Sequence, residues 1–175
     1  MVCPERAGTA NSFSVLVAGN QASIKSLSHN TKSSGVRTMK VGFDIHGVLD
    51  TFEVFREMLE KYCDDPTVEV HVISGLEGKH LEKELGHLID LSKIDAFFSV
   101  TDYLVEKGAV VEWINGMPWA DEEEWNMAKA AYCRLKHIDV LFDDSPVYAP
   151  YFNHIDTIYC QIHNPHRKRY KTRGK

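Results

Sequence analysis

The chain has 175 residues, of which 43% are apolar and 26% are charged, and its formal net charge is −5. This length and composition suit one globular domain with a sizeable core and leave no room for a second full domain. No apolar run approaches the ~20 residues of a membrane-spanning helix, and the N-terminus lacks the basic-then-apolar order of a secretory signal, so we expect a cytoplasmic protein that enters no membrane.

Charge divides the chain into three segments. Residues 1–38 hold four Lys/Arg, one acid and seven serines, which predicts either a disordered segment or an organelle-targeting leader. Residues 39–166 hold 10 Lys/Arg and 24 Asp/Glu, and this acidity argues against a broad nucleic-acid-binding face on the folded domain that we expect there. Residues 167–175, RKRYKTRGK, form a basic tail that is either merely solvated or able to contact nucleic-acid phosphates or an acidic partner.

Strand and helix patterns alternate in the acidic middle of the chain. Short apolar runs rich in β-branched and aromatic residues predict five strands, at 40–44, 68–74, 96–100, 138–143 and 157–162. Helical periodicity or charge order predicts helices at 52–63, 80–91 and 121–136. Because fully apolar strands alternate with helices, we expect an α/β three-layer sandwich with a parallel five-stranded sheet.

The segments between the predicted strands are too short to form a full cap, that is, an inserted domain that covers the site. One helix fills the space between the first two predicted strands. Asn115-Gly116, between apolar segments, predicts a hairpin turn and therefore a small flap. We expect a minimal cap.

Polar residues follow three of the predicted strands. Asp44 ends the first, Ser74 and Gly75 end the second, and Asp143 and Asp144 end the fourth. In parallel sheets, ligands bind beyond the carboxyl ends of the strands, so these side chains should converge. Carboxylate oxygens beside phosphate oxygens suit Mg²⁺. A carboxylate next to a metal-held phosphate can attack phosphorus and form an aspartyl-phosphate that water hydrolyses.

The same stretches, in the same order, resemble the motifs of the haloacid dehalogenase-like (HAD) phosphohydrolase superfamily. They are FDIHGV (43–48), VISG (72–75), a lysine before the fourth strand, and LFDDSP (141–146). The resemblance spans roughly residues 39–162, with a D-x-H variant of the first motif. It implies that the five strands, numbered along the chain, lie in the order 5-4-1-2-3.

The resemblance also implies roles for individual residues. Asp44 would be the nucleophile, and Mg²⁺ would be bound by the Asp44 carboxylate, the His46 backbone carbonyl and Asp143 or Asp144. Asp143, which ends the strand, is the favoured direct ligand. Ser74, Gly75 and a lysine would contact the phosphate.

His46 stands where phosphatases of this family carry a second aspartate, which protonates the leaving oxygen and later takes a proton from water. An imidazole, with an unperturbed pKa of ~6.5, can do both. Three interpretations stay open: His46 is a working acid/base, it marks an impaired site, or it only caps the loop.

Three lysines compete for the phosphate-binding role, namely Lys79, Lys129 and Lys136. We choose Lys129, placed in the N-terminal half of the last predicted helix, because W-x-x-x-K-A-x-x-C followed by LFDDS resembles deoxynucleotidase-type members. The competing interpretation is an ordinary surface lysine.

The expected function is Mg²⁺-dependent hydrolysis of a phosphate monoester, on a nucleotide or another small phosphorylated metabolite. Trp113, Trp119 and Trp125 could stack on a base or sugar, although core and rim packing is the favoured interpretation. Two alternatives are a noncatalytic HAD-like metal- or phosphate-binding or regulatory module, and a nucleic-acid end phosphatase guided by the basic tail.

Overall fold

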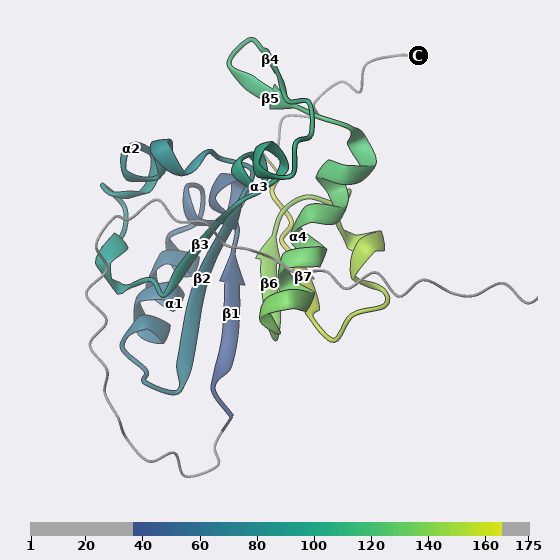
Figure 1. The fold of residues 1–175 in the computed structure, drawn as a ribbon. Coiled ribbons are helices and arrows are strands. Elements are labelled where there is room, and N and C mark those ends of the chain that lie inside the picture. The colour runs from purple at the N-terminus through teal and green to yellow at the C-terminus, as the bar shows by residue number, and fades with distance from the viewer. Residues whose placement is uncertain (1–36, 166–175) are drawn as a thin grey trace, which may run out of the picture. The chain divides into compact units, whose positions relative to one another are not determined.

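A computed structural model of the chain describes residues 37–165, which belong to one compact unit. The predicted leader, apart from Arg37 and Thr38, and the predicted basic tail lie outside the described residues. The fold is α/β, with a five-stranded parallel sheet flanked by helices (Figure 1). Within residues 37–165, no helix is both long enough and apolar enough to span a membrane.

The sheet has the strand order β3-β2-β1-β6-β7, and every neighbouring pair is parallel. Its strands are β1 (Met39–Phe43), β2 (Val68–Ser74), β3 (Ala96–Ser99), β6 (Val140–Asp143) and β7 (Ile158–Gln161). The α-helices are α1 (Glu53–Cys63), α2 (Leu81–Leu85), α3 (Val100–Glu106) and α4 (Glu122–Lys136). All five predicted strands are therefore confirmed to within two residues, as is their order, and the helices predicted at 52–63 and 121–136 are α1 and α4.

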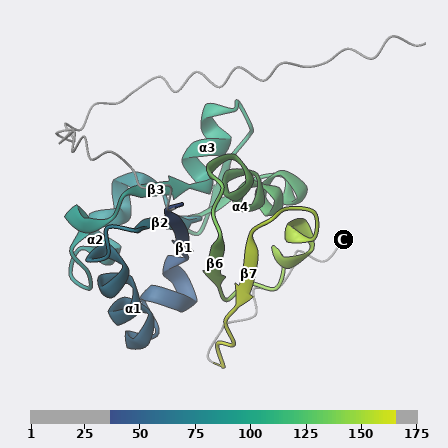
Figure 2. The same cartoon turned by 90° about the horizontal axis from the view of Figure 1, so that it is seen from below.

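Side chains alternate between two cores because successive strand residues point to opposite faces of the sheet. On one face, Val41 and Phe43 pack with Leu59 of α1 and Leu85 of α2. Gly42 faces the other side, where a Cβ would lie 2.7 Å from Cδ1 of Ile73. On that side Ile73 joins a second core, built largely with residues of α3 and α4. Figure 2 shows α1 and α2 on one side of the sheet and α3 and α4 on the other, which makes three layers.

The single helix predicted at 80–91 is wrong in length. α2 ends at Leu85, and 3₁₀ turns occupy Gly78–His80 and Leu91–Lys93. Gly86 follows α2 directly, and glycine inside a helix costs about 1 kcal/mol relative to alanine. The Asp90 side chain accepts a hydrogen bond from the Ser92 N–H (3.0 Å), which starts the next turn instead of continuing the helix.

The strand predicted at 96–100 ends one residue early because a helix begins there. Ser99 is the N-cap of α3, and its Oγ accepts a hydrogen bond from the Asp102 N–H (2.9 Å). The sequence analysis did not predict α3, since Val100 and Thr101 are β-branched residues that favour strands.

The predicted hairpin is confirmed. β4 (Glu112–Ile114) pairs antiparallel with β5 (Met117–Trp119). Asn115 and Gly116 join them with φ values of 53° and 75°, the left-handed backbone that favours these two residue types in tight hairpins. In Figure 1 this hairpin projects beyond the carboxyl edge of the sheet, as a flap of modest size.

Candidate active site

Three carboxylates meet at the carboxyl edge of the sheet, where the strand order reverses between β1 and β6. Asp44 follows β1, Asp143 ends β6, and Asp144 is the next residue. One oxygen from each lies within 4.8 Å of the other two. All three residues are at most 8% exposed. In open α/β sheets this switch point is where ligands bind, so the structure brings together the acids that the sequence analysis selected.

The backbone of the neighbouring strand holds Asp44. Its N–H donates to the carbonyl oxygen of Phe142 in β6 (2.9 Å), and its Oδ1 accepts a hydrogen bond from the Ile45 N–H (2.8 Å). Burial raises the pKa of the Asp44 carboxyl to about 7; Lys129 opposes this rise and Asp143 adds to it. The carboxyl thus changes its charge near neutral pH.

Gly47 makes the tight turn after Asp44 possible. Its φ is 82°, and its N–H donates to Oδ1 of Asp50 (2.7 Å). A Cβ at this position would lie 2.3 Å from Cγ of Asp144. Glycine is therefore required twice, by the left-handed backbone and by the close approach of the third carboxylate.

Lys129 is the buried cation of the site. It is 1% exposed, and its Nζ lies 2.6 Å from Oδ2 of Asp143 and 3.1 Å from Oδ1 of Asp44. Burial lowers the pKa of this ammonium, but Asp143 and Asp44 raise it by more, so Lys129 stays charged. It lies in the middle of α4 and not in the N-terminal half of the helix. The two competing lysines, Lys79 and Lys136, are exposed.

The three clustered acids offer oxygen ligands to a cation. Lys129 pairs with Asp44 and Asp143, and the third acid, Asp144, belongs to the same cluster, where water has little access. Clustered carboxylate oxygens are the donors that Mg²⁺ prefers, with water and substrate oxygens completing its shell. The donor set therefore fits a hard divalent cation.

Ser74, the last residue of β2, and Gly75, which follows it, lie at the same edge of the sheet. Ser74 is fully buried, and its Oγ accepts a long hydrogen bond from the Leu76 N–H (3.4 Å). The Gly75 carbonyl accepts a hydrogen bond from Thr101 Oγ1 (2.6 Å). A Cβ on Gly75 would lie 3.0 Å from Cζ2 of Trp125. Within residues 37–165, no hydrogen bond joins Ser74 to the three acids.

His46 lies in the turn between Asp44 and Gly47, and its side chain is exposed. In the part of the chain that the structure describes, its imidazole forms no hydrogen bond or ion pair. The structure thus places the imidazole close in sequence to the first acid without bringing it into contact with the carboxylate cluster.

Two aromatic residues support Lys129 in a way that the sequence analysis missed. The ring centre of Tyr148 lies 4.8 Å from Nζ of Lys129, and the Trp125 Nε1–H donates to the Tyr148 hydroxyl (3.1 Å). Trp125 lies four residues before Lys129, so helical spacing could have indicated that they share a face. Nothing in the sequence paired either residue with Tyr148. Asn164, also missed, donates from Nδ2 to Oδ2 of Asp144 (3.5 Å).

The three tryptophans have different environments. Trp125 is half-buried against the core between the sheet and α4, as the packing interpretation expected. Trp113 and Trp119, by contrast, are 49% and 37% exposed on the hairpin. The Nζ of Lys79, in the loop after β2, lies 5.7 Å from the centre of the Trp113 ring. Exposed aromatic surface therefore lies beside that loop.

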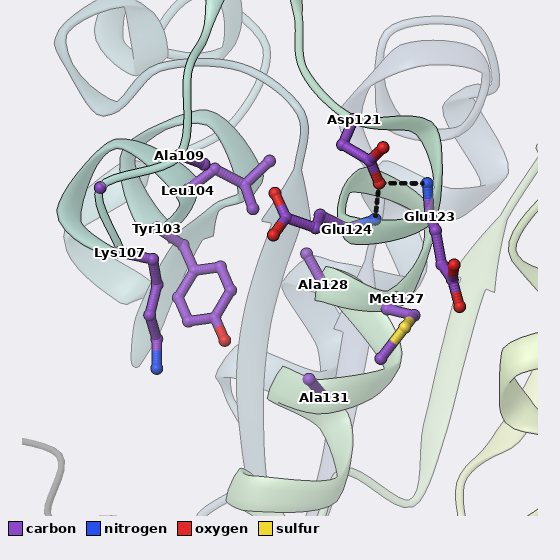
Figure 3. Close-up of a pocket in the computed structure, with 11 residues that line it drawn as sticks. Tyr103, Leu104, Lys107, Ala109, Asp121, Glu123, Glu124, Met127, Ala128 and Ala131 are labelled. Atoms are coloured by element: carbon purple, nitrogen blue, oxygen red, sulfur yellow. Dashed lines mark hydrogen bonds between the residues drawn. The ribbon is translucent and has the colours of Figure 1, made fainter.

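A shallow groove of about 470 Å³ lies between α3 and α4 (Figure 3). Its lining includes Tyr103, Leu104 and Met127, and the Glu124 carboxylate points towards Leu104. The Asp121 carboxylate accepts hydrogen bonds from the first turn of α4 and so caps that helix. None of the predicted site residues lines this groove, which is therefore separate from the carboxylate cluster.

Comparison of the chain with protein-family models, curated proteins and solved structures finds no match. Functional inference therefore starts from the geometry of the chain's own residues.

Proposed function

We propose that this chain is a Mg²⁺-dependent phosphate monoester hydrolase of the HAD type that acts through an aspartyl-phosphate at Asp44. One observation supports this function above all others. Asp44, Asp143 and Asp144 converge at the switch point of a parallel sheet, and the buried Lys129 bridges the first two. A carboxylate beside a cation-binding cluster is the arrangement that phosphoryl transfer to an aspartate requires.

The reaction has two displacements. An oxygen of Asp44 attacks phosphorus, the bond to the leaving oxygen breaks with its electron pair, and that oxygen takes up a proton. Water then attacks the phosphorus of the acyl phosphate and loses a proton, and the bond to Asp44 breaks to release inorganic phosphate. Oδ1 of Asp44 already accepts from the Ile45 N–H and lies beside Lys129, so we assign the attack to Oδ2.

Lys129, Ser74 and Gly75 would hold the phosphate oxygens. Lys129 is suited to this because its ammonium is charged and fixed beside the nucleophile. Ser74 ends β2, the strand next to β1, and Gly75 follows it. The Ser74 hydroxyl and the Gly75 backbone N–H are neutral hydrogen-bond donors, which suits phosphate oxygens that Lys129 already contacts.

Mg²⁺ would be held by the Asp44 carboxylate, the His46 backbone carbonyl and Asp143 or Asp144. When bound, it supplies charge neutralisation for the phosphoryl oxygens. Cation binding also favours the ionised form of Asp44, whose pKa of about 7 otherwise leaves part of the nucleophile protonated at neutral pH.

His46 would be the proton carrier. Its imidazole is exposed and has no partner among residues 37–165, so it is accessible to a leaving group and to water. An imidazole can both donate and accept a proton, as the two displacements require.

A nucleotide or another small phosphorylated metabolite is the proposed substrate class. The exposed Trp113 and Trp119 offer a stacking surface for a flat leaving group. The hairpin is small, so an open site would also admit the end of a nucleic acid, guided by the basic residues 167–175. The 24 acidic residues between 39 and 166 weigh against that larger substrate.

The second candidate is a noncatalytic metal- or phosphate-binding module. The observation that favours it is also at His46: the position expected to carry the acid holds an imidazole without contact to the carboxylates. Such a protein would bind Mg²⁺ at the three acids without turning over substrate.

The deciding experiment measures phosphate release from nucleotides, sugar phosphates and 3′- or 5′-phosphorylated oligonucleotides, with and without Mg²⁺. We expect Mg²⁺-dependent turnover that Asp44→Asn abolishes. His46→Asp separates the two candidates: a working imidazole loses rate or shifts the pH profile, whereas a decayed site gains activity. His154→Asp, at another exposed histidine, is the matched control. A folded, Mg²⁺-binding protein with no turnover on the panel would favour the binding module.

A further inference from the structure

The ammonium of Lys129 is enclosed by an aromatic ring as well as by carboxylates. The centre of the Tyr148 ring lies 4.8 Å from Nζ, while Asp143 and Asp44 approach at 2.6 and 3.1 Å. Tyr148 is 9% exposed and Lys129 is 1% exposed. A cation held against an aromatic face is stabilised most strongly when water is excluded from both, as here.

The Tyr148 ring is itself fixed by Trp125. The indole Nε1–H donates to the Tyr148 hydroxyl (3.1 Å). Trp125 and Lys129 are four residues apart on α4, so the indole and the ammonium project from the same side of the helix. Burial raises the pKa of the Tyr148 hydroxyl, which keeps it neutral and able to accept this hydrogen bond.

Trp125 also reaches the loop after β2. Its ring lies so close to Gly75 that a Cβ there would be 3.0 Å from Cζ2. The Trp125–Tyr148 pair therefore connects three parts of the site that are distant in sequence: the loop after β2, the buried face of α4 and the loop after β6.

A lysine side chain loses much rotamer freedom when it is ordered, so other contacts must hold its ammonium at one point. The two carboxylates attract the ammonium but also belong to the cation-binding cluster. A ring face supplies attraction without adding a charge or competing for the metal. Tyr148 can therefore hold the Lys129 ammonium in place when Asp44 and Asp143 coordinate a cation.

We infer that Tyr148, locked by Trp125, is a positioning residue that fixes the Lys129 ammonium where it can contact a phosphate oxygen. This deepens the proposed function and rests on it for the identity of the ligand. Tyr148 acts through Lys129 and does not itself touch the reacting atoms.

Two variants separate the ring face from the hydroxyl. Tyr148→Phe keeps the ring against the ammonium and loses the bond to Trp125, whereas Tyr148→Leu loses both. Tyr103→Leu is the matched control, because Lys107 Nζ lies 5.5 Å from the Tyr103 ring away from the acids. Trp125→Phe removes the hydrogen bond to Tyr148 together with part of the indole that packs beside Gly75, and it serves if Tyr148→Leu does not fold. Thermal unfolding establishes that each variant is folded.

The first measurement needs no ligand. In protein labelled with ¹⁵N at the lysine side chains, the resonance of the Lys129 ammonium is assigned by its loss in Lys129→Met. We expect a slowly exchanging ammonium in the wild type and Tyr148→Phe, and proton exchange faster by roughly tenfold or more in Tyr148→Leu. Equal exchange in wild type and Tyr148→Leu would overturn the positioning role.

The second measurement is calorimetric binding of inorganic phosphate at saturating Mg²⁺. We expect Kd to rise roughly ten- to thirtyfold in Tyr148→Leu, to rise severalfold at most in Tyr148→Phe and Trp125→Phe, and to stay unchanged in Tyr103→Leu. Mg²⁺ affinity alone should be unaffected in all four. An equal loss in Tyr148→Phe and Tyr148→Leu, or none in either, would refute the role of the ring face.

The two measurements also distinguish this inference from the proposed function. If wild-type protein binds neither Mg²⁺ nor phosphate but Tyr148→Leu still frees the ammonium, the phosphatase assignment fails and the positioning of Lys129 stands. If wild type binds both ligands and Tyr148→Leu changes neither exchange nor affinity, the positioning role fails and the phosphatase assignment stands.

Discussion

Gly47 lies so close to Asp144 that a side chain on the glycine would occupy the same space as the carboxylate. A Cβ there would be 2.3 Å from Cγ of Asp144, well inside van der Waals contact. The turn after β1 and the acid pair after β6 are thus fitted to each other, although they come from distant parts of the chain.

Gly47→Ala should therefore damage the acid cluster as well as the turn. The alanine must adopt a φ of 82°, which costs about 1–2 kcal/mol, and must also displace Asp144. We expect a larger loss of the free energy of unfolding than in Gly116→Ala, together with loss of Mg²⁺ binding. Gly116 is the matched control because its φ is 75° and, among residues 37–165 other than its two chain neighbours, no heavy atom lies within 4 Å of the point that a Cβ would occupy. Equal losses in urea denaturation, with Mg²⁺ binding intact in both, would contradict this expectation.

Lys129→Met should destabilise the protein strongly in the absence of metal. The substitution leaves the buried carboxylates of Asp143 and Asp44 without their cation, and breaking a buried ion pair in this way costs about 3–5 kcal/mol. Urea denaturation at pH 8 measures the loss, which should shrink at lower pH as the Asp44 carboxyl, whose pKa burial raises to about 7, becomes protonated.

Lys93→Met is the control for that experiment. Lys93 pairs with Asp64 at 2.9 Å on an exposed surface, where water screens the interaction, so its loss should leave the unfolding midpoint nearly unchanged. A similar change in both variants would mean that the buried pair adds nothing beyond a surface ion pair.

Mg²⁺ should stabilise the folded protein through the three acids. At a free concentration of 100 times its Kd, a ligand specific for the folded state adds about 2.7 kcal/mol, which appears as a rise in Tm. Asp143→Asn and Asp144→Asn should each reduce this rise, whereas Asp156→Asn, at an exposed carboxylate, should retain it. A rise in Tm that survives both substitutions would place the cation elsewhere.

Asp44→Asn should make the metal-free protein more stable at neutral pH. The pKa of Asp44 is raised by burial to about 7 from an ordinary value of 3.8, so the unfolded chain loses this proton first as pH rises. The carboxyl therefore lowers stability progressively between those two values. The variant should gain up to about 4 kcal/mol over wild type by pH 7.5 and little at pH 4.

Urea denaturation from pH 4 to 8 in the presence of a chelator measures this difference, and Asp156→Asn is the control. A gap between Asp44→Asn and wild type that stayed constant across the range would rule out a raised pKa. If Asp44→Asn also abolishes turnover, the predicted difference in the free energy of unfolding would show that the ionised Asp44 carboxylate, which attacks phosphorus, destabilises the folded protein.

The sequence was sufficient to predict the sheet and the acids at its edge. Runs rich in β-branched residues, such as 68–74, are visible from the sequence alone, and a parallel sheet necessarily gathers the residues after its strands at one edge. Asp44, Asp143 and Asp144 were therefore predictable as neighbours. Lys129 was chosen from a resemblance, and only the fold shows that its ammonium reaches two of those acids.

What the sequence could not reveal depends on contacts between distant segments. α3 begins at Val100 because Ser99 caps it, which overrides the strand preference of its first residues. Tyr148 is an ordinary aromatic residue in the chain, and its place against Lys129 follows from how the loop after β6 packs on α4. The exposure of His46 likewise depends on the left-handed turn at Gly47.

The parallel pairing of β1 with β6 also has a consequence for folding. These strands are neighbours in the sheet, yet Asp44 and Asp143 are roughly 100 residues apart in the chain. The two halves of the cluster meet only when this long-range strand pair forms, which carries the entropy cost of closing a long loop. Any cation that requires both halves will bind only to chains in which β1 and β6 are already paired, so its uptake would report the formation of this long-range pair and not an early local event.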